Sequence, residues 1–433
     1  MTNWIRNPIG RGLALTAGVV LVMACGREAP LDARVDRLLQ QREYAQALDL
    51  VAEALRKQPD AWPVHDLRVR VLLAAGRAEE SLSAYAARWS RGGPDSPILF
   101  HQIAITLLRE ALEGGDGLLR TRAAAALASF ASPDLLPICR EALGNPDASV
   151  RALAAQGVAR MPGEEAGRLL REALRDPEAR VRAAAATALT GRGDAQTRAA
   201  LERAIQDPSR EVGLRAAIAL ARLGEASAFA LLHRRLGDPE DSIRMLAAEA
   251  LGHLGNSDAA PDLRILLRDP NPYVQVYAAE ALARLEDPVG REALHKALRH
   301  PNQSVALYAA EAFSNLGDAT GAPRLIETLN SDGDLSARLY AAWTLARLGD
   351  LRGQPMLEQL LRHGDTQVRM QVTWTLGQMQ DGVGIPALRQ AISDEARPVR
   401  LQAAWALAAK LGENNVKGRL GGPPGRRSLR AGG

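Results

Sequence analysis

The chain repeats one pattern of apolar and polar positions every 31 residues over most of its length. In the clearest copy, residues 268–298 (RDPNPYVQVYAAEALARLEDPVGREALHKAL), a polar turn precedes two apolar stretches with helical spacing and a short break between them. Neither stretch can bury its apolar side alone, so neighbouring copies must stack. The pattern therefore predicts antiparallel helix pairs stacked into an α-solenoid.

The repeat has ten copies between residues 113 and 411, with an insertion near Ser331–Asp334 and a partial last copy. One position at the end of the first helix is apolar in every copy, which predicts a continuous core. These residues are Leu127, Val158, Leu189, Leu220, Leu251, Leu282, Phe313, Leu345, Leu376 and Leu407. Prolines recur in the turns beside Asp or Asn residues suited to cap a helix.

Composition agrees with closely packed helices, because 47% of the residues are hydrophobic but only 4% are aromatic. The fold class predicted is all-α. The formal net charge is +4, yet residues 412–433 alone carry +4 and the first 25 residues +2, so residues 26–411 carry about −2. The body of the protein therefore has no general electrostatic attraction for nucleic acid.

The repeats resemble the HEAT-like repeats of the phycobilisome-lyase type. The resemblance is carried by stretches such as Asp176–Leu189 (DPEARVRAAAATAL) and Asp238–Gly255 (DPEDSIRMLAAEALGHLG), and it covers residues 113–411. It implies a right-handed superhelix of about ten helix pairs, with the first helix of each pair on the concave side.

Residues 1–25 have the layout of a secretory signal, with Arg6 and Arg11 before an apolar run that ends at Cys25. The end of the run, LVMAC, resembles the bacterial lipobox, which implies cleavage before Cys25 and lipidation of that residue. An ordinary cleaved signal or an uncleaved anchor remains an alternative. Gly26, rather than Asp, follows the cysteine, and by resemblance to enterobacterial lipoprotein sorting this favours the outer membrane, with the protein facing the periplasm.

Residues 31–90 follow a helical pattern with a period nearer 34 residues. The stretch from Tyr44 to Pro59 resembles the second helix of a tetratricopeptide repeat, and a looser copy follows, with Ser81 and Arg88 in place of the expected alanines. We predict two degenerate tetratricopeptide-like repeats. Residues 91–112 are expected to form a hinge (RGGPDSP) and a capping helix, and residues 412–433 a disordered basic tail rich in Gly, Pro and Arg.

Variable positions of the first helix are expected to face the groove of the solenoid. Two columns three residues apart share one helical face and become aromatic and acidic in the later copies. The predicted partner-binding residues are Leu246, Glu249, His253, Tyr277, Glu280, Arg284, Tyr308, Glu311, Tyr340, Trp343, Gln371, Trp374, Gln402 and Trp405. The alternative is that the aromatic residues fill seams between helices and that Glu280 and Arg284 form a surface ion pair.

The sequence predicts no catalytic site, no metal site and no cofactor. None of the seven histidines precedes a glutamate, whereas deoxyhypusine hydroxylase, a metal enzyme built on similar repeats, binds iron through His-Glu pairs. Cys139 stands in a column of leucines, which indicates a packing residue. We therefore expect a protein that is not an enzyme.

These features predict a membrane-anchored scaffold that binds a protein or an extended, basic peptide in the concave groove. An enzyme subunit resembling the bilin lyases is the alternative from another class. A DNA-binding solenoid is a third possibility, disfavoured by the charge of the body and by the leader.

Overall fold

The computed structural model describes residues 29–130, 133–379, 382 and 384–420, and for residues 412–420 it gives the course of the helix alone. Throughout these residues the secondary structure is helical, from α1 to α24, without strands. The predicted all-α solenoid is confirmed. The leader with Cys25, and residues 421–433 of the tail, lie outside the described residues.

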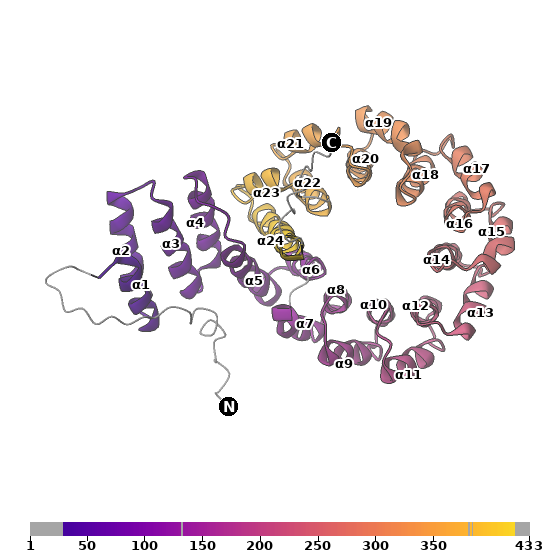
Figure 1. Ribbon diagram of the computed structural model, residues 1–433, viewed down its shortest axis with the longest axis horizontal. Helices are drawn as coiled ribbons and strands as arrows, with labels where there is room; N and C mark the ends of the chain where they lie inside the picture. The colour runs from indigo at the N-terminus through magenta and orange to yellow at the C-terminus, as the bar shows by residue number, and fades with distance from the viewer. Residues whose placement is uncertain (1–28, 131–132, 380–381, 383, 421–433) are drawn as a thin grey trace, which may run out of the picture.

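The solenoid helices form two concentric layers, which curve into a ring (Figure 1). The inner layer consists of α6 (Gly117–Leu127), α8 (Ala148–Ala159), α10 (Ala179–Ala188), α12 (Arg210–Arg222), α14 (Asp241–His253), α16 (Pro272–Arg284), α18 (Gln303–Asn315), α20 (Leu335–Arg347), α22 (Thr366–Gln378) and α24 (Arg397–Leu420). The outer layer consists of α7 (Leu136–Leu143), α9 (Glu164–Ala173), α11 (Ala195–Ala204), α13 (Ala226–Arg235), α15 (Ala260–Leu266), α17 (Pro288–Ala297), α19 (Ala322–Asn330), α21 (Gln354–Leu360) and α23 (Ile385–Ala391). Each predicted repeat is thus one inner and one outer helix, except the partial last repeat, which contributes α24 alone.

Four helices precede the ring and stand outside it (Figure 1). They form two helix hairpins, α1 (Leu31–Gln40) with α2 (Tyr44–Lys57), and α3 (Trp62–Ala74) with α4 (Ala78–Ser90). Gly76 turns the chain between α3 and α4 with a φ of 70°, a conformation that costs glycine no steric strain. The resemblance of this region to tetratricopeptide repeats stays a prediction.

Arg88 explains why the second hairpin departs from the expected alanine pattern. The guanidinium group is buried between the rings of Trp62 and Tyr85, with its central carbon 5.3 and 5.2 Å from their centroids. It donates a 2.8 Å hydrogen bond to Asp66 and another to the carbonyl of Pro94. The predicted hinge is therefore fixed to α4, and α5 (Pro97–Gly114) follows it as the predicted single helix.

Arginine–aspartate pairs join successive repeats, a role that the sequence analysis did not assign. In each pair, an arginine early in one inner helix donates two hydrogen bonds to the aspartate in the turn before the next inner helix. The pairs are Arg151–Asp176 (2.7 and 2.9 Å), Arg182–Asp207 (2.7 and 2.9 Å), Arg244–Asp269 (2.7 and 2.9 Å) and Arg369–Asp394 (2.8 and 3.0 Å). Two-point hydrogen bonds of this kind fix the position of the arginine relative to the aspartate, and so the position of one inner helix relative to the turn that precedes the next. Each pair also neutralises its own charges.

Asp207 illustrates how such a pair is satisfied. Besides Arg182, its carboxylate accepts a 2.8 Å hydrogen bond from the backbone N–H of Ser209. The hydrogen bond from Arg182 lowers the pKa of Asp207, against the opposing effect of burial. A carboxylate with a lowered pKa in the folded state contributes stability above its unfolded pKa of about 3.9 and loses it as the pH falls further.

The ring is closed, because the last inner helix, α24, packs against α5 and α6 at the start of the solenoid (Figure 1). Across this junction Arg122 of α6 donates a 2.7 Å hydrogen bond to Gln402 of α24. Gln402 in turn donates to the carbonyl of Met370 at 3.1 Å, and Trp405 is buried, with 2% of its surface exposed. The sequence predicted a superhelix but not its closure.

Ion pairs from α4 and the hinge reinforce the closure from outside the ring. Glu79 of α4 accepts hydrogen bonds from Arg397 and, at 3.4 Å, from Arg400 of α24. Asp95 accepts one from Arg389 of α23, whose guanidinium carbon lies 4.5 Å from the centroid of the Trp89 ring. The N-terminal helices thus hold the two ends of the solenoid together.

Helix α24 corrects the predicted start of the tail. It was expected to end near Leu411, but it continues to Leu420, so residues 412–420 are helical rather than irregular. None of the helices in the described part of the chain is long and apolar enough to cross a membrane.

Candidate functional site

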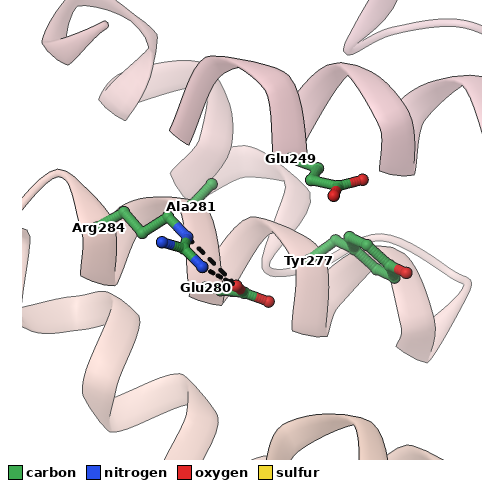
Figure 2. A pocket seen from close by; sticks show the side chains of 5 residues that line it. All are labelled: Glu249, Tyr277, Glu280, Ala281 and Arg284. Carbon is green, nitrogen blue, oxygen red and sulfur yellow. Dashed lines mark hydrogen bonds and ion pairs between the residues drawn. The ribbon is translucent and has the colours of Figure 1, made fainter. Parts of the chain in front are cut away.

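The inner helices place the predicted groove residues on a common face. Hydrogen bonds between neighbouring helices establish this alignment: Asn315 of α18 donates to Glu280 of α16 at 3.1 Å, and Tyr340 of α20 donates to Glu311 of α18. Figure 2 shows the same arrangement one repeat earlier in the chain, where Glu249 of α14 lies beside Tyr277 of α16 and both line a pocket. The two predicted columns are therefore adjacent from α14 to α20.

Aromatic side chains form a nearly continuous row along this part of the ring. Tyr273 and Tyr308 have ring centroids 5.4 Å apart, Tyr308 and Tyr340 are 6.1 Å apart, and Tyr340 and Trp343 are 5.7 Å apart. Their planes are inclined by 85°, 49° and 48°, the tilted geometries that aromatic pairs prefer. The same sequence columns include Tyr277 on α16 and Trp374 on α22. We call these two residues, together with Tyr308, Tyr340 and Trp343, the aromatic face.

Two members of the aromatic face are exposed far more than their size would lead one to expect. Trp374 on α22 has 54% of its surface exposed, and Tyr308 on α18 has 37%. Gln371, one turn before Trp374, is exposed as well. Tyr308 contacts the rings of Tyr273 and Tyr340, and Trp374 is exposed two inner helices further along. Clustered exposed aromatic side chains are typical of binding surfaces, whereas single exposed apolar residues are not.

The carboxylates between the aromatic rings are paired within the protein. Glu280 accepts a 2.7 Å hydrogen bond from Arg284, as the packing alternative anticipated. Asn315 joins the two halves of the network, since it donates to Glu280 at 3.1 Å and accepts from Arg347 at 2.5 Å. Arg347 also lies 3.5 Å from a carboxylate oxygen of Glu311. The expected acidic groove is thus largely neutralised by the arginines.

Glu249 is the exception, because within the described residues it forms no ion pair or hydrogen bond, and its side chain is exposed. Neighbouring helices partly desolvate the carboxylate, and this desolvation is the main cause that raises the pKa of Glu249. The nearby charge of Glu280 is the second cause. Burial similarly raises the pKa of Glu311, and it raises the pKa of Tyr277 to about 12. A cation bound beside Glu249 would offset the cost of this carboxylate charge.

The network includes two residues that the sequence analysis missed, Asn315 and Arg347. Both stand four residues after the glutamate or tryptophan column, on the same side of the helix. This third column supplies the signal that could have identified them, since it is largely basic or polar: Arg160, Arg222, His253, Arg284, Asn315, Arg347 and Gln378. Partial desolvation by the neighbouring helices, and secondly the charge of Arg284, lower the pKa of His253.

Three predicted groove residues have a different setting. Gln402 and Trp405 belong to the ring closure, where α24 is covered by α5 and α6, so they are not available to a partner. The correction has a simple cause, because the residues that cover them come from the other end of the solenoid. Leu246 is half-buried and packs against the core.

The described residues contain no group of three or more His, Cys, Asp or Glu side chains arranged to hold a metal ion. Cys139 is fully buried, and burial raises the pKa of its thiol to about 12. Its sulfur lies 3.3 Å from the position that a Cβ on Gly157 would take. This thiol packs in the core and is not poised as a nucleophile.

The stacked helix pairs define an α-solenoid built of helical repeats. The model of the family of HEAT repeats matches residues 105–190, 168–252, 197–268, 261–336 and 322–408. These matches cover more than half of the chain, so the protein belongs to the HEAT-repeat family. No curated protein matches the chain significantly in sequence.

Solved structures with a similar fold include a protein of Escherichia coli, YibA, at 23% identity and a TM-score of 0.36, covering 58% of this chain and 95% of that one. The complex of CpcE and CpcF of phycocyanin lyase from Nostoc sp. PCC7120 is similar at 22% identity and a TM-score of 0.34, covering 55% of this chain and 94% of that one. Human deoxyhypusine hydroxylase, in complex with glycerol, is similar at 17% identity and a TM-score of 0.32, and the match covers 57% of this chain and 96% of that one.

These neighbours correct the prediction that the protein is not an enzyme. Two of them, the phycocyanin lyase and deoxyhypusine hydroxylase, are enzymes, so membership of this fold does not exclude catalysis. At these identities and TM-scores the likeness assigns no reaction to this chain.

Proposed function

We propose that the protein holds an extended segment of a partner protein inside the ring, against the aromatic face. The observation that carries the proposal is the exposure of Tyr308, which belongs to the row of contacting rings from Tyr273 to Trp343, together with the exposure of Trp374 on α22. Tyr and Trp supply large, rigid contact areas at interfaces, and their faces attract the guanidinium groups of arginine and the rings of proline.

The size of the ring is compatible with such a partner. Inner helices packed about 9 Å apart around a closed circle give a diameter of roughly 30 Å between helix axes, and side chains reduce the free width to about 20 Å. An extended chain or a single helix about 10–12 Å across would fit into that width. A folded domain would not, so the proposed ligand is a segment rather than a protein surface.

Pairing of the carboxylates changes the expected ligand chemistry. Because Arg284 and Arg347 already compensate Glu280 and Glu311, the aromatic face offers π surfaces and amide groups more than negative charge. Glu249 remains for one basic side chain. We therefore propose a segment rich in proline with scattered arginine or lysine, rather than a strongly basic one.

Replacing Trp374 and Tyr308 together by alanine is expected to weaken binding by roughly 700-fold, because interface anchors each contribute about 2 kcal/mol and the two sum to about 4 kcal/mol. Fluorescence anisotropy with a labelled Arg-Pro-Pro repeat peptide measures the loss. Ile265→Ala on α15 is the matched control, since Ile265 is 71% exposed but lies on the outer layer. Both variants should retain the helical circular dichroism signal, and equal binding by them would refute the proposed site.

The membrane attachment is a separate part of the proposal and rests on the lipobox-like sequence that ends at Cys25. We propose that lipid chains on Cys25 hold the ring on the periplasmic side of a bacterial envelope membrane, preferably the outer one. Several chains give much firmer attachment than one, because each buried CH₂ contributes about 0.8 kcal/mol.

Cys25→Ser is expected to move the protein from the membrane fraction to the soluble fraction and to abolish labelling by a clickable palmitate analogue. Cys139→Ser provides the control, since that thiol is buried in the core. Retention of the Cys25→Ser protein in membranes without label would indicate an uncleaved anchor instead.

A further inference from the structure

We infer that residues 421–433 of the chain itself occupy the aromatic face, as an internal ligand that a partner must displace. The inference rests on the proposed function and names a second occupant of the same site. It starts from the exposed area of Trp374 and Tyr308 on the aromatic face, because aromatic side chains gathered on one face are typical of a surface that binds another segment.

The chemistry of this segment matches the face. Its sequence, GGPPGRRSLRAGG, contains Pro423 and Pro424 and three arginines, and no acidic residue. Proline rings and guanidinium groups are the side chains that stack on Tyr and Trp faces. Glu249, exposed and without a partner among the described residues, supplies one carboxylate for an arginine. No other segment outside the described residues combines prolines with arginines in this density.

The position of α24 brings the segment within reach. This helix belongs to the inner layer and lies end-on beside α6 and α22 in the view along the ring axis (Figure 1), so the segment that follows Leu420 starts at the ring itself. Residues 412–420 displace that starting point by roughly 13 Å along the helix axis. Fully extended, thirteen residues span up to about 43 Å, which exceeds the distance across a ring roughly 20 Å wide.

Tethering makes even weak binding effective. A chain of the predicted, unstructured kind has a root-mean-square length of about 5–6 Å times the square root of its residue number, or roughly 20 Å here. That length is close to the span, so the effective concentration at the face is in the millimolar range. A segment that binds as a free peptide with a Kd of about 0.1 mM would then weaken the binding of a competing ligand about tenfold.

The experiment compares the full chain with the chain ending at Leu420, and uses the labelled peptide GGPPGRRSLRAGG as the probe in an anisotropy titration. The shortened chain is expected to bind the probe, and the full chain about tenfold more weakly. A full chain with Arg426→Ser, Arg427→Ser and Arg430→Ser should behave as the shortened chain does, although its length is unchanged. Trp374→Ala in the shortened chain should reduce probe binding at least tenfold, whereas Ile265→Ala should not.

Several outcomes would overturn the inference. Equal probe binding by the full and shortened chains would exclude an internal ligand, and concentration-dependent dimers of the full chain in sedimentation velocity would place the segment in a second copy. Binding of the probe to vesicles of phosphatidylglycerol, but not to the shortened chain, would assign the segment to the membrane. The Arg-Pro-Pro peptide separates the two proposals: if it binds both chains equally, the proposed function stands and the internal ligand is refuted, and if neither probe binds, both proposals fail.

Discussion

Replacing Trp405 by alanine is expected to open the ring and to lower the free energy of unfolding by about 3–5 kcal/mol, the range found when large core aromatics are truncated. Trp405 is 2% exposed and lies in the junction where α24 meets α5 and α6. Its removal leaves a cavity at the contact that joins the two ends of the solenoid. The result is measured by urea unfolding and by the radius of gyration from small-angle X-ray scattering, which should increase.

Two control variants sharpen this expectation. Trp405→Phe keeps most of the volume and removes an indole N–H that is buried without a hydrogen-bond partner among the described residues, so the ring should stay closed and the stability loss should be small. Trp374→Ala, in the same sequence column, should change stability by less than about 1 kcal/mol because that side chain is 54% exposed. An unchanged radius and stability in Trp405→Ala would show that the closure does not depend on this residue.

The second large effect is expected at the arginine–aspartate pairs. Arg369→Ala should destabilise the protein by about 3–5 kcal/mol, because it leaves the buried carboxylate of Asp394 without its counter-ion. The two side chains are 5% and 10% exposed, and Arg369 also donates to the carbonyls of His363 and Gly364. Urea unfolding followed by circular dichroism measures the loss, and hydrogen exchange should show it concentrated in α22 to α24.

Matched variants distinguish this pair from an ordinary surface contact. Arg215→Ala removes an ion pair between Arg215 and Glu211, whose side chains are 31% and 50% exposed, respectively. This change should lower the free energy of unfolding by less than about 0.5 kcal/mol. Arg369→Lys keeps the charge but loses the two-point hydrogen bond, so an intermediate loss is expected. If Arg369→Ala and Arg215→Ala cost the same, the pairs between repeats contribute no more than surface contacts do.

The repeat pattern predicted most of the fold, because the period of 31 residues sets both the helix pair and its stacking. It did not predict closure, since the curvature of a solenoid depends on small rotations at every helix contact, which leave no mark in the hydrophobic pattern. Trp374 and Trp405 demonstrate the limit: they share a sequence column, yet one is exposed and the other is buried by helices almost three hundred residues earlier in the chain.

The candidate site was predicted only in part for a related reason. The columns correctly brought Tyr308, Tyr340 and Glu311 together, because helical spacing alone fixes that face. Spacing does not decide how charges pair, so the role of Asn315 between Glu280 and Arg347 became visible only from the distances. Polar networks depend on side-chain geometry, which the residue types at equivalent repeat positions do not specify.

Closure also changes how this protein can assemble with its own copies. An open stack of repeats ends in two apolar faces, and a head-to-tail contact between such faces propagates from molecule to molecule into a fibre unless a polar cap blocks it. Here α24 packs against α5 and α6 of the same chain, so both apolar end faces are buried. The junction therefore also prevents polymerisation. A protein whose ring has been opened would expose two complementary apolar surfaces that can bind other molecules head to tail.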